Sequence, residues 1–396
     1  MINLLMVTGL YFPDINGASL QCKLVSETLL SKKKLKIKIL TGSLQSRFKK
    51  DLINNIEVFR FGINKKFNIM NIINLFNFII NVFILVKKSN IVHIHGWSKR
   101  NLIILIFCNI LRIKTVFKIT SFGIDDPMSI KNKSYLNWIF FKNFDYYIGS
   151  TPEMMQSSLN SGINVNKFIF IRNMVDTNKF RLFSDYEKLF FRKKYGYLSN
   201  DKVIISVGHF SDDKNHKLLI DSYFELIKID HNLKIIIIGS FDKINYEVDK
   251  SIYDEIYQQL LNNNELINFK FINSTDTIEE FYALSDIFVT SSKREGLSNA
   301  LLEAMSCGLG VISTNVNNLS TYLIDDEFNG LINNDMFDTK ELIYKISFFL
   351  NNDKYRFICG KNANLFINSH YNLDSEINKI LQLYENLINN NYRLDN

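Results

Sequence analysis

The sequence predicts an α/β protein made of two doubly wound, Rossmann-like domains that face each other across a cleft. Three observations predict this fold. Short β-branched runs alternate with longer helical patterns, the alternation restarts at Val203, and runs such as Ile235–Gly239 are apolar at almost every position. A fully apolar run is typical of a parallel strand buried on both faces, and strand–helix alternation implies right-handed βαβ units.

The expected strands fall into two sets. In the first half they are Ile2–Thr8, Ile37–Thr41, Val58–Phe61, Ile91–His95, Thr115–Thr120, Tyr146–Ser150 and Phe168–Ile171. In the second half they are Val203–Val207, Lys234–Ile238, Phe269–Ile272, Ile287–Thr290 and Val311–Ser313. Ligands of open α/β sheets bind outside the carboxyl ends of the strands, so the cleft is the expected site.

The stretch Asn173–Asn200 has few apolar positions in register, so we place the domain boundary near residue 178. The two domains are then residues 1–178 and 179–372. A helical pattern over Leu373–Ile388 lies in the final segment, residues 373–396, and we expect this helix to pack back on the first domain.

Composition narrows the class of protein. With 46% hydrophobic and 22% charged residues among 396, the chain is neither disordered nor fibrous. Its cysteines have apolar neighbours and form no Cys-x-x-Cys pair, which favours small buried residues in a reducing cytoplasm over disulfides or zinc ligands. The first apolar run is too short for a signal peptide and is expected to be a buried strand.

Charge is distributed unequally. Residues 1–178 hold 24 Lys+Arg and 9 Asp+Glu, so their net charge is 24 − 9 = +15, whereas residues 179–396 hold 23 and 31, giving 23 − 31 = −8. Some of the lysines belong to an ordinary solvated surface. The large difference in net charge between the two halves favours an anionic partner of the first half. A cytoplasmic leaflet, an anionic lipid-linked acceptor and nucleic acid all qualify as this partner. The basic clusters are Lys32–Lys34 with Lys36 and Lys38, Lys49–Lys50, Lys65–Lys66 and Lys87–Lys88.

The stretch Phe67–Val86 is long enough to cross a bilayer, but regularly spaced amides interrupt it. Five amides would be costly in hydrocarbon, and at helical spacing they occupy about half of the helix circumference. The stretch therefore predicts an amphipathic helix that packs on a sheet or lies on a membrane surface. The amides are those of Asn68, Asn71, Asn74, Asn77 and Asn81.

The segment Ser291–Thr314 carries the strongest chemical signal. It leaves a strand, turns through Glu295, Gly296 and Leu297, and enters a helix that Ser298 or Asn299 can cap. Such a helix start presents backbone N–H groups and a positive dipole end, which suit a diphosphate. Glu303, one turn further, can accept hydroxyl hydrogen bonds from a ribose, and Glu295 can reach the sugar. Taken singly, each glutamate is equally explained as an acid favoured by the dipole.

Two glutamates separated by seven residues within EGLSNALLEAMSCG resemble the signature of the family-4 retaining glycosyltransferases of the GT-B fold. Further segments resemble the same family in the same order. In VGHFSDDKNHKLLIDSY, Lys214 retains the lysine that the family uses for the donor's diphosphate, and His209 stands at the arginine position. In FPDINGAS, Gly17 is retained and Asn16 replaces the first glycine of the loop. Phe122 stands where the family has a histidine near the transferred sugar, for which Ser121 or Asp125 are candidate substitutes.

The resemblance implies a retaining transfer of a sugar from a nucleotide-diphosphate sugar to an acceptor hydroxyl. Glu295, Lys214 and His209 are then the expected catalytic residues, with no metal and no cofactor besides the donor substrate. The expected donor-binding residues are Gly17, Gly296, Leu297, Ser298, Asn299, Glu303 and Ile272.

Two other hypotheses about the function stay open at this point. One is a catalytically inactive glycan- or lipid-binding relative, which the phenylalanine at position 122 favours. The other is a NAD-dependent oxidoreductase, which the absence of Gly-x-Gly-x-x-Gly after the first strand disfavours. The basic half and the amphipathic helix suggest a lipid-linked glycan acceptor of cell-surface polysaccharide synthesis, such as O-antigen or capsule. The expected location is the inner face of the cytoplasmic membrane, with an anionic membrane surface and no nucleic acid as partner.

Overall fold

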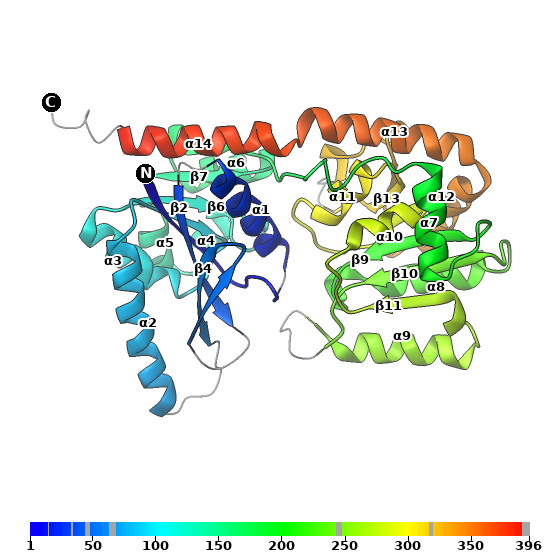
Figure 1. The fold of residues 1–396 in the computed structure, drawn as a ribbon, viewed down its shortest axis with the longest axis horizontal. Helices are drawn as coiled ribbons and strands as arrows, with labels where there is room; N and C mark the ends of the chain where they lie inside the picture. The colour runs from blue at the N-terminus through cyan, green and yellow to red at the C-terminus, as the bar shows by residue number, and fades with distance from the viewer. Residues whose placement is uncertain are drawn as a thin grey trace. The chain divides into compact units, whose positions relative to one another are not determined.

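The computed structural model describes residues 1–14, 16–32, 35–43, 48–62, 69–242, 248–316 and 320–389, with side chains from residue 75 onward in the helix that begins at Ile69. Lys33, Lys34, Lys65, Lys66 and Asn68 of the sequence analysis lie outside these residues. The chain divides into two compact units (Figure 1), Met1–Met174 with Leu373–Asn396, and Val175–Asn372. The division after Met174 falls slightly before residue 178, where the sequence analysis placed it.

The first unit contains an eight-stranded sheet in the order β3-β4-β2-β1-β5-β6-β7-β8. Its neighbouring strands are parallel except for the antiparallel pair β3–β4. The strands are β1 (Ile2–Thr8), β2 (Leu35–Ser43), β3 (Lys49–Ile53), β4 (Ile56–Gly62), β5 (Ile91–His95), β6 (Lys114–Lys118), β7 (Tyr146–Gly149) and β8 (Phe168–Phe170).

Helices cover both faces of this sheet. One face packs against α1 (Gly17–Ser31) and α14 (Leu373–Asn389). The other packs against α2 (Ile69–Lys87) and α3 (Asn101–Leu111), with α4 (Pro127–Lys133), α5 (Tyr135–Phe141) and α6 (Pro152–Ser161) beside them. Because both faces of the sheet are covered, the central strands are continuous runs of apolar residues.

Helix α14 is anchored on the first unit by polar contacts as well as by its apolar face. The backbone N–H of Arg172 donates to Glu376 at 2.9 Å, and the hydroxyl of Tyr384 is hydrogen-bonded to Nδ1 of His93 at 2.6 Å. His93 and His95, both on β5, are buried. Residues two apart on a strand share a face, and here that face lies beneath α1 and α14.

The second unit contains a six-stranded, entirely parallel sheet in the order β11-β10-β9-β12-β13-β14. Its strands are β9 (Lys202–Val207), β10 (Leu233–Ile238), β11 (Phe269–Ile272), β12 (Ile287–Thr290), β13 (Gly310–Thr314) and β14 (Leu331–Asn333). The helices of this unit are α7 (Asp185–Tyr195), α8 (His216–Leu226), α9 (Lys250–Asn262), α10 (Ile278–Leu284), α11 (Asn299–Ser306), α12 (Thr339–Asn351) and α13 (Asp353–His370).

Every expected strand is present, but the sequence analysis missed three elements. Strands β3 and β14 escaped it because β3 is a charged edge strand and β14 has only three residues. Helix α7 lies within the stretch that was expected to be irregular, because its composition is largely charged. Its start is nevertheless marked by a capping box between Ser184 and Glu187, a pattern that is visible in the sequence.

All four cysteines are buried and unpaired, as expected: Cys22, Cys108, Cys307 and Cys359. Among the described residues, no helix is both long enough and apolar enough to cross a membrane.

Candidate functional site

The loops that follow β9 and β12 meet because these strands are neighbours in the second sheet. Lys214 ends the short 3-10 helix Asp212–Lys214 after β9, and Glu295 lies in the loop after β12. The ammonium group of Lys214 donates to Oε1 of Glu295, and the buried hydroxyl of Ser292 donates to the same oxygen at 2.9 Å. Two residues that the sequence analysis assigned to the reaction are thus in direct contact.

Further contacts hold the two loops together. The hydroxyl of Ser291 donates to the carbonyl of Asn215 at 2.8 Å, and the backbone N–H of Lys293 donates to the carbonyl of Asp213 at 2.8 Å. The aliphatic stem of Lys214 passes over Gly208, where an added Cβ would lie 3.1 Å from it. A side chain larger than glycine at this position would therefore push Lys214 out of place.

Helix α11 begins directly after this loop. Ser298 is its N-cap, with its hydroxyl accepting from the N–H of Leu301, and Gly308 follows the helix with φ +75°. The sequence analysis left Ser298 and Asn299 as alternative caps, and Ser298 is the one observed. The positive end of the helix dipole points toward the loop that carries Glu295.

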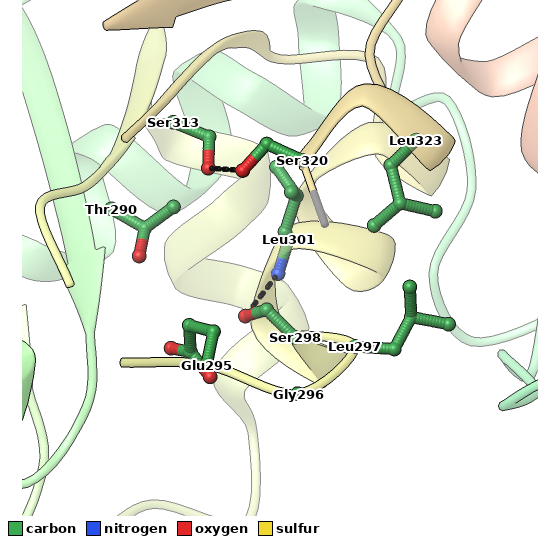
Figure 2. A pocket seen from close by; sticks show the side chains of 9 residues that line it. All are labelled: Thr290, Glu295, Gly296, Leu297, Ser298, Leu301, Ser313, Ser320 and Leu323. Carbon is green, nitrogen blue, oxygen red and sulfur yellow. Dashed lines mark hydrogen bonds between the residues drawn. The ribbon is translucent and has the colours of Figure 1, made fainter. Parts of the chain in front are cut away.

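A small hollow lies at this helix start (Figure 2). It is lined by Thr290, Glu295, Gly296, Leu297, Ser298, Leu301, Ser313, Ser320 and Leu323. Ser313 and Ser320 are hydrogen-bonded to each other at 3.0 Å on one side of it. The helix start suits an anionic group of a ligand, whereas the hydroxyl groups and the Glu295 carboxylate suit its hydroxyl groups.

Glu303 lies one turn into α11, and its side chain is held by a residue that the sequence analysis did not single out. The hydroxyl of Tyr282, on α10, donates to Oε2 of Glu303 at 3.0 Å. Burial raises the pKa of Glu303 to about 7, while the hydrogen bond from Tyr282 opposes this rise. No local sequence signal points to Tyr282, because its partner comes from another helix.

His209 follows β9, and its Nδ1 accepts a hydrogen bond from the backbone N–H of Ser240 at 3.3 Å. This bond places the ring proton of the neutral imidazole on Nε2. Next to it, Gly239 comes so close to Gly208 that an added Cβ would lie 1.8 Å from the Gly208 carbonyl oxygen. The loops after β9 and β10 are therefore packed tightly at the position of His209.

His216 is buried on α8. Its Nε2 donates to the carbonyl of Gly208 at 3.0 Å, and burial lowers its pKa to about 4. Its neutral ring thus fixes the backbone directly before His209.

Gly17 and Phe122 belong to the first unit. Gly17 is the exposed first residue of α1, and Asn16 is the N-cap, with its side chain accepting from Ser19 N–H at 3.0 Å. The asparagine at the family's glycine position therefore starts the helix. Phe122 packs partly buried against the apolar core of its unit.

Asp125, a candidate substitute for the missing histidine, is engaged by its own loop. Its carboxylate accepts from the hydroxyl of Thr120 at 2.7 Å and from the backbone N–H of Ser121 at 2.7 Å. Burial, the largest effect, raises the pKa of Asp125 to about 6. This carboxylate therefore stabilises its loop.

The structure thus brings Lys214, Glu295 and the residues of the α11 start together in the second unit. Ile272 ends β11, two strands away from β9, where its side chain packs partly buried on the core. The described part of the chain contains no group of three or more His, Cys, Asp or Glu side chains with the geometry of a metal site.

Comparison with known proteins points to one family for this second unit. Residues 187–366 match the family model described as Glycosyl transferases group 1. The chain is 30% identical to the capsular polysaccharide biosynthesis glycosyltransferase CapM of Staphylococcus aureus over 192 residues, 48% of this chain and 47% of that protein. It is 29% identical over 157 residues, 39% of each chain, to the Campylobacter jejuni N-acetylgalactosamine-N,N'-diacetylbacillosaminyl-diphospho-undecaprenol 4-alpha-N-acetylgalactosaminyltransferase.

The matched stretch thus spans about half the length of CapM and less of the Campylobacter enzyme. The fold is matched over nearly the whole chain by the crystal structure of Anabaena Alr3699/HepE in complex with UDP and glucose. That comparison has a TM-score of 0.77 at 16% identity and covers 97% of this chain and 100% of the other. The chain therefore has the fold of the GT-B glycosyltransferases, and its residues 187–366 are similar to the Glycosyl transferases group 1 family.

Proposed function

We propose that this protein is a retaining glycosyltransferase that moves a sugar from a nucleotide-diphosphate sugar to an acceptor hydroxyl. The contact between Lys214 and Glu295 beside the start of α11 carries the proposal. A lysine held at the loop that leads into a helix N-terminus supplies positive potential of the kind that a departing diphosphate requires.

In the proposed reaction, the bond between the anomeric carbon and the diphosphate oxygen breaks, and the acceptor oxygen forms a new bond to that carbon. Lys214 and the α11 start stabilise the charge that grows on the diphosphate. The acceptor's hydroxyl proton passes to the leaving diphosphate oxygen, because attack and departure occur on the same face. Glu303 binds the ribose hydroxyls, and Glu295 contacts the transferred sugar.

We further propose that the acceptor is a lipid-linked glycan used in the synthesis of a cell-surface polysaccharide. The names of two relatives support this class: one acts in capsular polysaccharide biosynthesis, and the other transfers a sugar to a diphospho-undecaprenol-linked acceptor. The basic first half of the chain, with its net charge of +15, suits an acceptor that carries a diphosphate.

A ligand screen followed by a transfer assay tests the proposal. Nucleotide sugars are compared by thermal shift, since a ligand at ~100 times its Kd stabilises the folded state by ~2.7 kcal/mol. The donor identified in this way is then incubated with lipid-linked glycans, and the anomeric configuration of the product is determined by NMR. Donor binding without transfer to any acceptor or to water would favour the inactive relative. Binding of NAD with no nucleotide sugar bound would favour the oxidoreductase.

A further inference from the structure

Helix α2 carries two apolar stripes on opposite sides. The inner stripe packs on the first sheet and consists of Phe78, Val82, Leu85 and Val86, all buried. The outer stripe is exposed and consists of Phe76, Ile80, Phe83 and Ile84. Each stripe follows helical spacing, and the sheet needs only one of them.

The neighbouring helix α3 extends the exposed stripe into a surface. The rings of Phe83 on α2 and Phe107 on α3 are in contact, with centroids 5.3 Å apart. Ile106 and Ile110 of α3 are exposed at 39% and 69%, and Phe76 and Ile80 of α2 are exposed at 63% and 54%. We call this surface, formed by Phe76, Ile80, Phe83, Ile84, Ile106 and Ile110, the α2–α3 face.

An apolar surface of this extent usually marks an interaction site, because soluble proteins seldom leave large side chains clustered in water. The charges around the α2–α3 face indicate the partner. Residues 58–124, which contain both helices, include ten Lys+Arg and no Asp or Glu. Lys87 and Lys88 follow the exposed stripe at the end of α2, and Arg112 caps α3.

Those three cations lie at one edge of the face. Both helices return the chain to the start of a parallel strand, α2 to β5 and α3 to β6. Their C-terminal ends are therefore on the same side, at the amino ends of the strands. The surface thus combines a row of large apolar side chains with an exposed basic border.

We propose that the α2–α3 face docks on an anionic phospholipid membrane, with its apolar side chains at the level of the headgroups and its lysines against lipid phosphates. This combination of apolar and basic residues is typical of helices that lie in a membrane interface. A second copy of the chain fits less well, because residues 58–124 contain no Asp or Glu, so the same face of the copy offers the basic border no acidic partner. Docking does not depend on the proposed reaction.

Cosedimentation of the full chain with lipid vesicles tests the proposal. The vesicles contain phosphatidylcholine alone or mixed with anionic phosphatidylglycerol. The wild type is expected to prefer the anionic vesicles. The triple variant Phe76→Ser, Ile80→Ser, Ile84→Ser is expected to bind them about 100-fold more weakly, because three apolar anchors are lost. This loss should persist as salt rises.

The double variant Lys87→Gln, Lys88→Gln isolates the charge contribution. Each lysine near an anionic surface contributes about fivefold in affinity, so the pair contributes about 25-fold at low salt. The difference from the wild type should vanish at about 0.5 M salt, where exposed charges are screened.

A matched control removes exposed apolar side chains elsewhere. Ile267→Ser, Phe357→Ser, Leu365→Ser changes three side chains of the second unit that are exposed to a similar or greater extent. This variant is expected to bind vesicles like the wild type. Thermal unfolding is measured to check that each variant is folded, which is expected because only exposed side chains change.

Three results would overturn the proposal. The first is wild-type binding of the anionic vesicles by the α2–α3 triple variant. The second is equal binding of neutral and anionic vesicles by the wild type at all salt concentrations. The third is a dimer of the wild type that becomes a monomer in the triple variant while vesicle binding is unchanged, because a second copy would then cover this face.

Turnover of the donor in detergent-free buffer without vesicles is measured in parallel, so that loss of docking is separated from failure of the proposed reaction.

Discussion

The hydroxyl of Tyr282 donates a 3.0 Å hydrogen bond to Oε2 of Glu303 and thereby joins α10 to the acid proposed to bind the donor's ribose. The contact fixes the orientation of the Glu303 carboxylate. Together with burial, the same contact determines the pH at which this carboxylate becomes charged. Burial raises the pKa of Glu303 to about 7, and the Tyr282 hydrogen bond limits the rise because it stabilises the charged form.

Donor affinity is therefore expected to depend on pH. Below pH 7 the carboxyl is mostly protonated and accepts hydroxyl hydrogen bonds poorly, so affinity for the nucleotide sugar should increase as pH rises through about 7. Tyr282→Phe should move this profile to higher pH, because the interaction that lowers the pKa is lost. Calorimetric titration over about one pH unit on each side of that pKa measures both profiles. Glu303→Gln, which cannot ionise, should give a flat profile, and an unchanged slope in this control would exclude Glu303 as the titrating group.

Loss of the Glu303 carboxylate should mainly weaken binding. The ribose contact is equal in the ground and transition states, so Glu303→Ala is expected to cost ~1.5–3 kcal/mol, or roughly 10- to 150-fold in donor affinity. Turnover at saturating donor should change little. Steady-state kinetics separates the two effects, and a fall in kcat with unchanged KM would contradict the assignment.

Lys214→Ala should have the opposite signature. Lys214 faces oxygens whose charge grows as the sugar–phosphate bond breaks, so kcat is expected to fall ~100- to 1,000-fold. Lys217→Ala is a suitable control, because Lys217 is a nearby exposed lysine that pairs with Glu255 at 2.5 Å. Wild-type turnover in Lys214→Ala would remove the lysine from the reaction and with it the proposed site.

His209 offers a gain-of-function test. If His209 takes the place of the family's arginine, its ring brings at most one N–H, that of Nε2, to a diphosphate, because Nδ1 accepts from the Ser240 N–H. An arginine would offer charged hydrogen bonds, which are about 1 kcal/mol stronger each. His209→Arg is therefore expected to tighten binding of the nucleoside diphosphate about fivefold. Equal affinities would place His209 away from the phosphates.

Phe122 distinguishes an active enzyme from an inactive relative. Its ring packs against the core of the first unit. If the site works with an apolar side chain at position 122, Phe122→His should not raise turnover with the native donor, because the rest of the site is adapted to the phenylalanine. Turnover of both proteins with the same donor decides the question. A large increase would show that the wild type lacks a functional group, as the inactive-relative hypothesis requires.

Stability of the second unit depends on buried Asp286. Burial acts to raise the pKa of this carboxyl, but Lys188 and Arg192 outweigh it and hold the pKa below its ordinary value. Its stabilising contribution is thus present above about pH 4 and is lost as pH falls through the lowered pKa. Asp286→Asn should cost about 3–5 kcal/mol in urea unfolding at neutral pH, because two cations lose their partner.

Asp212→Asn is the control for this measurement, because Asp212 is an exposed carboxylate whose pair with Lys293 should contribute less than about 1 kcal/mol. Equal losses in the two variants would show that burial of Asp286 does not strengthen its interactions.

Much of the fold follows from local sequence. Strand β1 and strand β12 lie where their apolar runs predict them, and Gly308 adopts the left-handed conformation expected after α11. These features depend on residues only a few positions apart: apolar runs, a capping hydroxyl and a glycine after the helix. The α11 segment and its Glu295–Glu303 spacing could therefore be read from the chain directly.

Other features depend on which strands become neighbours. Lys214 meets Glu295, 81 positions along the chain, because β9 and β12 pair in the sheet. Tyr282 on α10 and Glu303 on α11 likewise come into contact only in the folded unit. Neither contact has a signature in the local sequence. The apolar pattern of α2 likewise indicated an amphipathic helix, but only packing shows that the sheet covers Phe78 and Val82 and leaves Phe76 and Ile80 exposed. Local backbone and capping preferences act over a single helical turn, whereas the partners of a side chain are chosen by the order in which distant strands assemble.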